Sequence, residues 1–494
     1  MNINNVIPTR RNLARTLGLT AATLCIAVLA SCMSNSRAMQ NGGEVTGQRS
    51  AAYNEPAPFG MVEIKRGYLK AGVENNDTLW GIVTPTREIS VDGFWMDQTE
   101  VTNSMYRQFV EWVRDSIIRE RLADPQYGGD ETYKIEVDRY GDPVTPHLNW
   151  TKPIPWRKPT EEQERAIESV YTRHPIDGTK MLDIRQLNYR YEVFDYEKAA
   201  LRKYRLDPAE RNLNTDITTD SDEVVMISKD TAYIDENGRI VRQTIERPLS
   251  SLYDFLNTYI VPVYPDTTVW VNDFTNANNE TYMKLYFSSP TYNDYPVVGV
   301  TWEQAQAFCA WRTEYLLRGL GPQARYVQRY RLPSEIEWEF AARGANGNPY
   351  PWEGDASTSD KGCFLANFKP DRGNYTEDGN LITSKVGIYG ANSNGLFDMA
   401  GNVAEWTNTV YTEAGVVSMS DVNPELRYDA ALEDPYFLKR KSVRGGSWKD
   451  PISLIRSAWR SYEYQNQPRS FIGFRCVRSK AASTSNTATT RKGK

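Results

Sequence analysis

Residues 395–406 read GLFDMAGNVAEW, and a second glycine-rich segment, RGGSW, follows at residues 444–448. Both segments combine glycines, which permit tight turns, with a tryptophan, which fills a core. The regions around them, from Met61 to about Val110 and from Pro296 to Arg478, share this density of Trp, Gly and short apolar runs. Gly, Asn and Asp punctuate these regions, and long alternating runs are few. This pattern predicts a loop-rich α+β domain with a few helices and short strands, held together by aromatic packing.

Three helices are indicated by the residues that precede them. Thr301 and Gln304 have the spacing of a capping box, and apolar residues, Cys309 among them, follow at helical intervals. Residues 334–337 repeat this arrangement. Thr102 is a good N-cap for a third helix. We therefore expect helices to begin at these three points, with Cys309 facing a core.

The middle of the chain, residues 112–295, is charged, tyrosine-rich and irregular. We expect polar helices at residues 161–171 and 196–204. A hairpin is expected over residues 224–245, turning at residues 235–238, which read DENG. This composition predicts that the segment has no strong core of its own. It should therefore lie on the main domain or on a partner.

Read in order, the dense regions resemble the formylglycine-generating-enzyme/sulfatase-modifying-factor domain, a C-type-lectin-related fold. The resemblance implies a domain at residues 58–479, interrupted by an insertion at residues 112–295. Its polar motif residues, such as Glu100, Glu405 and Arg475, favour structural roles, because loops use such groups to bond backbone amides and carbonyls. The segments that carry the resemblance are GMVEI (60–64), FWMDQTEVTN (94–103), PVVGVTW (296–302), RLPSEIEWE (331–339), GLFDMAGNVAEW (395–406), RGGSW (444–448) and GFR (473–475).

The resemblance also implies that the chain is not an enzyme. Active formylglycine generators carry two copper-binding cysteines just after the Gly-Gly-Ser-aromatic turn, whereas residues 449–456 here read KDPISLIR. Asp450 stands near the first of these positions, and a carboxylate cannot hold Cu(I) as a thiolate pair does. The related iron-dependent sulfoxide synthases need a histidine cluster, and this chain has only His147 and His174. We therefore expect a pseudoenzyme with no catalytic residues.

A calcium site is the one ligand site that the resemblance retains. Members of the family commonly bind calcium through loop oxygens, and calcium accepts carboxylate and carbonyl oxygens alike. A hydrogen-bonded loop without an ion is an equally open alternative. The matching residues are Asn367, Phe368 (by its carbonyl), Asp398, Gly401, Val403 and Glu405.

The N-terminus indicates export and lipid anchoring. The apolar run at residues 17–30 is 14 residues long, too short for the roughly 20 residues that span a bilayer, so it is typical of a signal peptide. Residues 29–32 read LASC and resemble the lipobox of bacterial lipoproteins, which implies removal of residues 1–31 and lipidation of Cys32. A plain secretory signal is the alternative. We expect a flexible tether at residues 32–57 and a disordered tail at residues 480–494.

Charge and cysteine content narrow the possible functions. Residues 1–31 carry three Arg and no acid, so the remaining chain has a net charge of −8, which excludes a nucleic-acid-binding role. Its other cysteines are Cys309, Cys363 and Cys476. Three cysteines form no disulfide framework; an exported protein could form one bridge, but small buried hydrophobes are the favoured interpretation.

The lipoprotein signal, the missing cysteine pair and the long insertion together resemble the PorK and GldK lipoproteins of the type IX secretion and gliding machinery. The resemblance implies a structural component, lipid-anchored in the outer membrane and facing the periplasm. It would form a homo-oligomeric ring with a PorN/GldN-type partner, in contact with other type IX secretion components. A GldJ-type sister lipoprotein shares the domain, although the insertion favours the first assignment. A carbohydrate- or protein-binding surface lipoprotein and a formylglycine-generating-type enzyme stay open as alternatives.

Overall fold

The computed structural model describes residues 56–72, 86–137, 143–207, 210–211, 224–320, 327–344, 347–370, 374–415 and 419–480. The predicted signal peptide, Cys32 and the tether as far as residue 55 lie outside these residues, as does the tail beyond Lys480. Within the described ranges no helix has the length and apolar character needed to cross a membrane.

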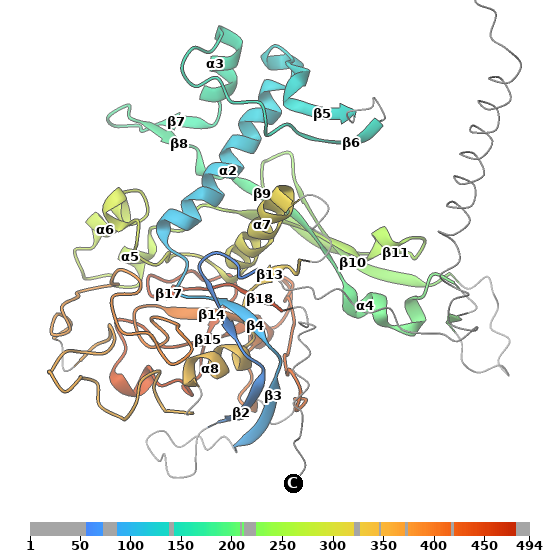
Figure 1. Ribbon diagram of the computed structural model, residues 1–494. Coiled ribbons are helices and arrows are strands. Elements are labelled where there is room, and N and C mark those ends of the chain that lie inside the picture. Colours follow the sequence, from blue (N-terminus) through green and yellow to red (C-terminus); the bar gives the residue numbers. More distant parts are fainter. Residues whose placement is uncertain are drawn as a thin grey trace, which may run out of the picture. The chain divides into compact units, whose positions relative to one another are not determined.

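Two four-stranded sheets lie in a mixed α and β fold (Figure 1). The first has the order β1-β4-β18-β13 and is antiparallel throughout. The second has the order β16-β15-β14-β17, and only its β14–β17 pair is parallel. A separate hairpin consists of β2 (Gly67–Ala71) and β3 (Arg87–Val91). The strands of the two sheets are β1 (Met61–Ile64), β4 (Phe94–Asp97), β13 (Tyr330–Arg331), β14 (Ala404–Val410), β15 (Arg440–Arg444), β16 (Ser461–Tyr464), β17 (Ile472–Gly473) and β18 (Val477–Ser479).

The three predicted helix starts are confirmed. Helix α2 (Asn103–Leu122) begins after Thr102, whose side chain accepts a hydrogen bond from the Met105 backbone amide. Helix α7 (Trp302–Leu320) follows a complete capping box between Thr301 and Gln304. Helix α8 (Glu335–Arg343) begins with the second predicted box. These caps satisfy backbone amides that have no partner within the helix.

Aromatic packing between α2, α7 and the sheets forms the main core, as the sequence predicts. The Phe308 ring on α7 stacks on Tyr106 of α2, with ring centroids 5.5 Å apart. Phe308 also contacts Phe474 edge to face at 5.4 Å. A second cluster surrounds the fully buried Trp338 of α8 and includes residues from β2, β3 and β4. The predicted core position of Cys309 is confirmed, with 1% of its surface exposed.

The middle segment contains the predicted elements and several short additions. The predicted helices are α3 (Glu161–Glu168) and the shorter α4 (Tyr196–Ala200), and the predicted hairpin is β10 (Met226–Ile234) with β11 (Ile240–Pro248). Helix α2 runs through position 112, so the expected start of the insertion falls inside a helix. The further elements are β5 (Lys134–Val137), β6 (Pro143–Leu148), β7 (Tyr171–Arg173), β8 (Lys180–Leu182), β9 (Asn188–Phe194), β12 (Leu256–Pro262), α5 (Val269–Asn272) and α6 (Glu280–Leu285).

The expectation that the middle segment lacks a core of its own is wrong in part. Ile118 and Leu122 at the end of α2 pack with Tyr133, Ile167 and other buried residues in a separate small cluster. Its members are spread over α2, α3 and the segments between them, so no single run of apolar residues predicts it. The same segment also supplies Tyr189, together with Val261 and Phe287, to the main core. Residues 112–295 therefore lie on the main domain and complete it.

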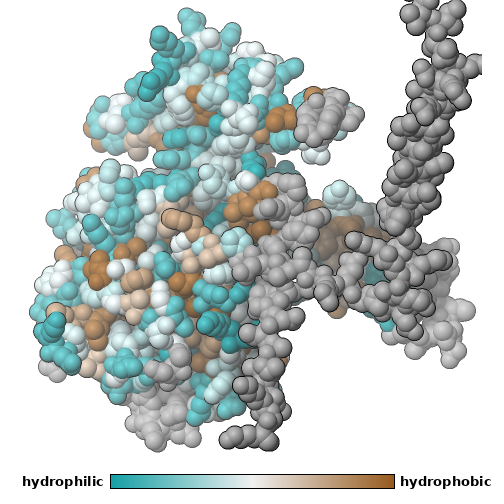
Figure 2. Space-filling view, viewed as in Figure 1, coloured by the Kyte–Doolittle hydropathy of each residue, from teal (hydrophilic) through white to brown (hydrophobic). Residues whose placement is uncertain are grey.

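The face of the molecule in Figure 2 is mostly polar, with separate apolar areas. Large apolar side chains are also exposed on and beside α4 and the 3-10 turn Leu252–Phe255, two elements that contact each other. We call these exposed side chains, Tyr196, Leu201, Leu252 and Tyr253, the arm patch. Leu252 and Tyr253 are 59% and 75% exposed, although both are large apolar side chains.

Candidate functional site

The GLFDMAGNVAEW segment leads into a buried ionic centre. Glu405 on β14 accepts hydrogen bonds from Arg475 at 2.6 to 2.9 Å and from the indole nitrogen of Trp338 at 2.7 Å. Arg475 further donates to the backbone carbonyls of Asp97 and Phe397, at 3.1 and 2.9 Å. Both charged side chains are almost completely buried. The pair joins β14, the end of β4, the loop at Phe397 and helix α8 inside the domain, which agrees with the structural role predicted for Glu405 and Arg475.

A second polar group lies beside this pair. Glu100 is fully buried, and its Oε1 accepts a hydrogen bond from Asn402 Nδ2 at 3.0 Å. Glu100 Oε2 and Asp398 Oδ1 are both buried and have no hydrogen-bond partner. Burial raises the pKa of Glu100 well above its ordinary value, the Asp398 carboxyl raises it further, and Arg475 opposes the shift. The pKa of Asp398 is also raised, chiefly by burial.

The backbone of this segment is held in left-handed conformations. Asp398 and Asn402 have φ of 55° and 58°, values that residues other than glycine rarely adopt. Between them Gly401 has φ of 75°, and a Cβ at this position would lie 2.1 Å from the Asn367 carbonyl oxygen. Only glycine fits there. The turn therefore brings residues 398–402 against Asn367.

The positions that would carry the copper-binding cysteines form a closed turn. Asp450 Oδ2 accepts hydrogen bonds from the backbone amide and the hydroxyl of Ser447, at 2.9 and 2.7 Å. Its Oδ1 accepts from Lys449 at 2.8 Å. The preceding Gly446 has φ of 65° and packs against the Leu454 carbonyl. The Asp450 carboxylate is therefore used to stabilise the turn, and residues 449–456 contain no sulfur.

Of the six predicted calcium residues, Asn367, Asp398 and Glu405 have oxygens that already accept hydrogen bonds. Glu405 is committed to Arg475 and Trp338. The Asn367 carbonyl accepts from the Asn402 amide at 2.7 Å. Asp398 Oδ2 accepts from the Gly387 amide at 2.6 Å, which leaves its Oδ1 free.

In the described residues, carboxylate side chains alone do not form a calcium site at this turn. No group of three or more His, Cys, Asp or Glu in the described part of the chain is placed to hold a metal ion. Two buried oxygens without a hydrogen-bond partner are Asp398 Oδ1 and, outside the predicted set, Glu100 Oε2. Sequence reasoning assigned Glu100 a structural role and did not place it beside Asp398. The calcium site stays a prediction.

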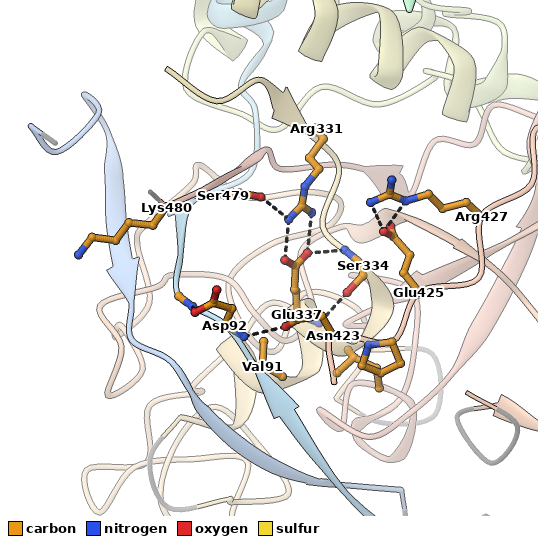
Figure 3. A pocket seen from close by; sticks show the side chains of 13 residues that line it. Val91, Asp92, Arg331, Ser334, Glu337, Asn423, Glu425, Arg427, Ser479 and Lys480 are labelled. Atoms are coloured by element: carbon orange, nitrogen blue, oxygen red, sulfur yellow. Dashed lines mark hydrogen bonds and ion pairs between the residues drawn. The ribbon is translucent and has the colours of Figure 1, made fainter. Parts of the chain in front are cut away.

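Two pockets among the described residues lie away from these residues. One, of about 200 Å³, is lined by Arg331, Glu337 and Lys480 among others (Figure 3). Arg331 forms a two-point ion pair with Glu337, with both contacts at 2.6 Å. The other, of about 630 Å³, lies between β9 and α7. Neither pocket is lined by a residue of the predicted calcium set or of the 449–456 turn.

A family model described as the sulfatase-modifying factor enzyme 1-like domain matches residues 48–189 and 223–480. The match therefore includes much of the segment expected to be an insertion. In solved structures, PvdO from Pseudomonas aeruginosa covers 85% of this chain, and this chain covers 94% of PvdO, at 14% identity and a TM-score of 0.41.

Some relatives are named as enzymes, and others are named as inactive. The inactive C-alpha-formylglycine-generating enzyme 2 of Bos taurus is 33% identical over 191 residues, or 37% of this chain and 50% of that protein. The formylglycine-generating enzyme of Mycobacterium tuberculosis is 35% identical over 190 residues, or 37% of this chain and 57% of that protein. The chain thus spans about half the length of the relatives that it matches.

Proposed function

The chain belongs to the sulfatase-modifying factor enzyme 1-like domain family, and from this premise we propose that it is a non-catalytic structural member of that family. We propose further that it is a lipoprotein of the PorK/GldK type, anchored through Cys32 in the outer membrane and facing the periplasm. There it assembles with a PorN/GldN-type partner into a ring of the type IX secretion machinery. The family includes a relative named inactive, so loss of catalysis has a precedent within it.

The observation that carries the non-catalytic proposal is the turn at residues 449–456. A copper-dependent oxidation of a substrate thiol needs two thiolates that are open to the metal and to the substrate. Here Asp450 occupies that place, and its carboxylate bonds Ser447 and Lys449. The described cysteines lie elsewhere in the sequence, and Cys309 and Cys476 are buried. No pair of exposed thiolates is therefore offered at this turn.

The arm patch supports the assembly part of the proposal. The four side chains of the arm patch are exposed on and beside α4 and the 3-10 turn Leu252–Phe255. Both elements belong to the middle segment. Large apolar and tyrosine side chains of this kind are typical of surfaces that become buried against another protein. A ring requires each subunit to offer surfaces for its neighbours or its partner. We assign the arm patch to this contact.

A binding lipoprotein is the second candidate, and one observation favours it. Tyr436 and Phe437 are 74% and 56% exposed, and Tyr462 nearby in the fold is 40% exposed. Tyr436 packs edge to face against Tyr464, which in turn contacts Tyr462. Exposed aromatic rings can stack on sugars as well as on proteins. Retention of the purified protein on a glycan column would support this candidate.

An activity assay tests the non-catalytic proposal directly. The purified protein, loaded with Cu(I), is incubated with a sulfatase-type cysteine peptide, and the formylglycine peptide is measured by mass spectrometry. The enzyme of Mycobacterium tuberculosis is the positive control. We expect no product above the background without protein. Product formation that is lost on substitution of Cys363 would overturn the proposal.

Fatty-acid labelling tests the anchor. Cells that express the full chain are grown with a radiolabelled fatty acid, and the protein is immunoprecipitated. Label in the wild type and none in Cys32→Ala supports lipidation at that residue. Label that persists in Cys32→Ala contradicts it, because no other residue in the LASC segment can form the thioether.

A further inference from the structure

We propose that β9 and the groove beside it bind an extended, acidic segment of another protein, which adds to β9 as a further strand. The groove has a volume of about 630 Å³ and lies between β9 and α7. It is lined by no residue of the buried ionic centre and by none of the arm patch. This proposal rests on the proposed function only for the presence of a partner.

The backbone of β9 leaves one edge of the strand open. Strand β9 pairs with β12, and the two form a sheet of their own. The Val263 amide donates to the Leu187 carbonyl at 2.9 Å, and the Asp195 amide donates to the Phe255 carbonyl at 2.8 Å. In an antiparallel pair the bonded residues alternate, so odd-numbered residues of β9 bond β12. The amides and carbonyls of Arg190 and Glu192 therefore point away from β12, and no backbone group in the described part of the chain bonds them.

The groove follows this open edge and not one face of the strand. Successive side chains of a strand point to opposite faces, yet all of residues 189–192 line the groove. The groove therefore lies where the two faces meet. Helix α7, which contacts both β9 and β12, forms its other wall (Figure 1). A strand added about 4.8 Å from β9 would satisfy the outward-pointing amides and carbonyls.

The charges around the groove select an acidic segment. Glu314 Oε1 accepts from Arg318 at 2.5 Å, and its Oε2 accepts from the Tyr189 hydroxyl at 2.7 Å. Glu192 lies 3.7 Å from Arg190. Both carboxylates thus already face a donor, and three arginines against two carboxylates leave one positive charge in excess. The charged residues that line the groove are Arg190, Arg318, Arg329, Glu192 and Glu314.

The helix side of the groove adds apolar contact. Ala310 and Leu317 of α7 line it, as do the rings of Tyr189 and Tyr191. A strand that lies there presents alternate side chains to the helix and to solvent. Its segment should therefore alternate apolar residues with Asp or Glu. On a chain whose net charge is −5, such a groove is a local exception to the overall repulsion of acidic partners.

Photo-crosslinking in native membranes tests the occupant. Benzoylphenylalanine replaces Arg190 in the full chain, membranes are irradiated, and the crosslinked peptides are identified by mass spectrometry. The same probe at Ile176, which is 89% exposed on another element, is the control. We expect position 190 to crosslink to a segment of another protein that contains Asp or Glu. Crosslinks only to this chain's own sequence, or none above the control, overturn the proposal.

A proline variant tests whether the backbone of β9 binds the segment. Glu192→Pro removes one outward-pointing amide and leaves the bonds to β12, which use the odd-numbered residues. Glu192→Ala keeps the amide and removes an anion, so it should strengthen capture of the partner. We expect capture by Glu192→Pro to be at least tenfold weaker than by Glu192→Ala, with melting temperature as the check on folding. Equal capture by two folded variants overturns the added strand.

Synthetic peptides test recognition without the partner. Two fluorescein-labelled ten-residue peptides, one alternating valine with glutamate and one alternating valine with lysine, are titrated against the purified full chain by fluorescence anisotropy. We expect the glutamate peptide to bind at least tenfold more tightly, and its affinity to fall as salt is added. Arg329→Ala should weaken it at least threefold. Equal binding of the two peptides overturns the proposal, and it decides if Glu192→Pro does not fold.

Failure of this proposal and failure of the proposed function give different results. A native complex that shows no crosslink from position 190 contradicts the groove and leaves the assembly role standing. A protein that enters no native complex, yet binds the glutamate peptide selectively, contradicts the assembly role and leaves the groove standing.

Discussion

Arg475 and Glu405 form an ion pair in the interior of the domain, in which two guanidinium nitrogens contact the carboxylate at 2.6 to 2.9 Å. Neither side chain is more than 1% exposed. A charge in such a place is tolerated only while its partner is present, because water cannot replace the lost contact. The pair explains why the GLFDMAGNVAEW and GFR segments are both needed to build one core.

Glu405→Gln should therefore destabilise the protein strongly. The substitution leaves the Arg475 guanidinium buried without a counter-charge, which costs about 3 kcal/mol or more of unfolding free energy. Denaturant unfolding measures this loss. Glu168→Gln is the matched control, because its ion pair with Lys180 is 44% and 42% exposed and should contribute within about 0.5 kcal/mol. Equal effects of the two substitutions would contradict the account of the buried pair.

The pKa of Glu100 predicts a pH dependence. An acid whose pKa is raised by folding keeps a proton that the unfolded chain has released. Its contribution is therefore most favourable below the unfolded pKa of about 4.3 and is lost as the pH rises towards the folded pKa. Glu100→Gln removes this titration and keeps an amide oxygen for Asn402.

We expect the unfolding free energy of Glu100→Gln to fall less than that of the wild type between about pH 4.5 and pH 7. Carboxyls with lowered pKa, such as Glu335 and Glu337, act in the opposite direction but contribute equally to both proteins. Parallel pH profiles for the two proteins would show that Glu100 is ionised in the folded state.

Calcium binding predicts a response to chelation. If an ion binds at the predicted residues, with the unpaired Oδ1 of Asp398 among its ligands, a chelator should lower the melting temperature and excess calcium should restore it, since the ion binds only the folded state. Asp398→Asn should abolish this response, and the exposed Asp360→Asn should keep it. Glu405 is unsuitable as a test because its loss also leaves Arg475 unpaired. An unchanged melting temperature in protein shown to be metal-free beforehand favours the loop without an ion.

Substitutions in the arm patch should weaken capture of the partner. Leu252→Ser combined with Tyr253→Ser changes two exposed side chains, so the fold should persist while capture of the partner weakens tenfold or more, by about 1.4 kcal/mol. Ile176→Ser is the control, because this side chain is 89% exposed on a different element. Pull-down from native membranes, with melting temperature as the check on folding, measures both. Unchanged capture by the double variant would show that the interface is not the arm patch and lies elsewhere on the chain.

The helix starts could be predicted from sequence because their signals are local. Thr301 with Gln304, and Ser334 with Glu337, lie three residues apart, and each pair closes its box as predicted. The turn at residues 235–238 joins β10 to β11 for the same reason. Local hydrogen bonding determines these features, so a short stretch of residues is enough to predict them.

The relationships that were missed are those between distant residues. Cys309 and Cys476 are 167 positions apart, and Glu100 and Asn402 are 302 apart, yet each pair is in contact. Glu405 matched a calcium position by resemblance, but its carboxylate binds Arg475, a choice that depends on where the GFR strand lies. Only the packed fold decides which of several polar partners a buried carboxylate meets.

The most direct test of the central claim is the mass and composition of the native complex. The protein is extracted from membranes in a mild detergent through an affinity tag at its C-terminus, separated by size, and its co-purifying chains are quantified by mass spectrometry. The proposed role predicts a high-mass assembly that contains several copies of this chain and one stoichiometric periplasmic partner. A monomer that carries no stoichiometric partner would contradict it.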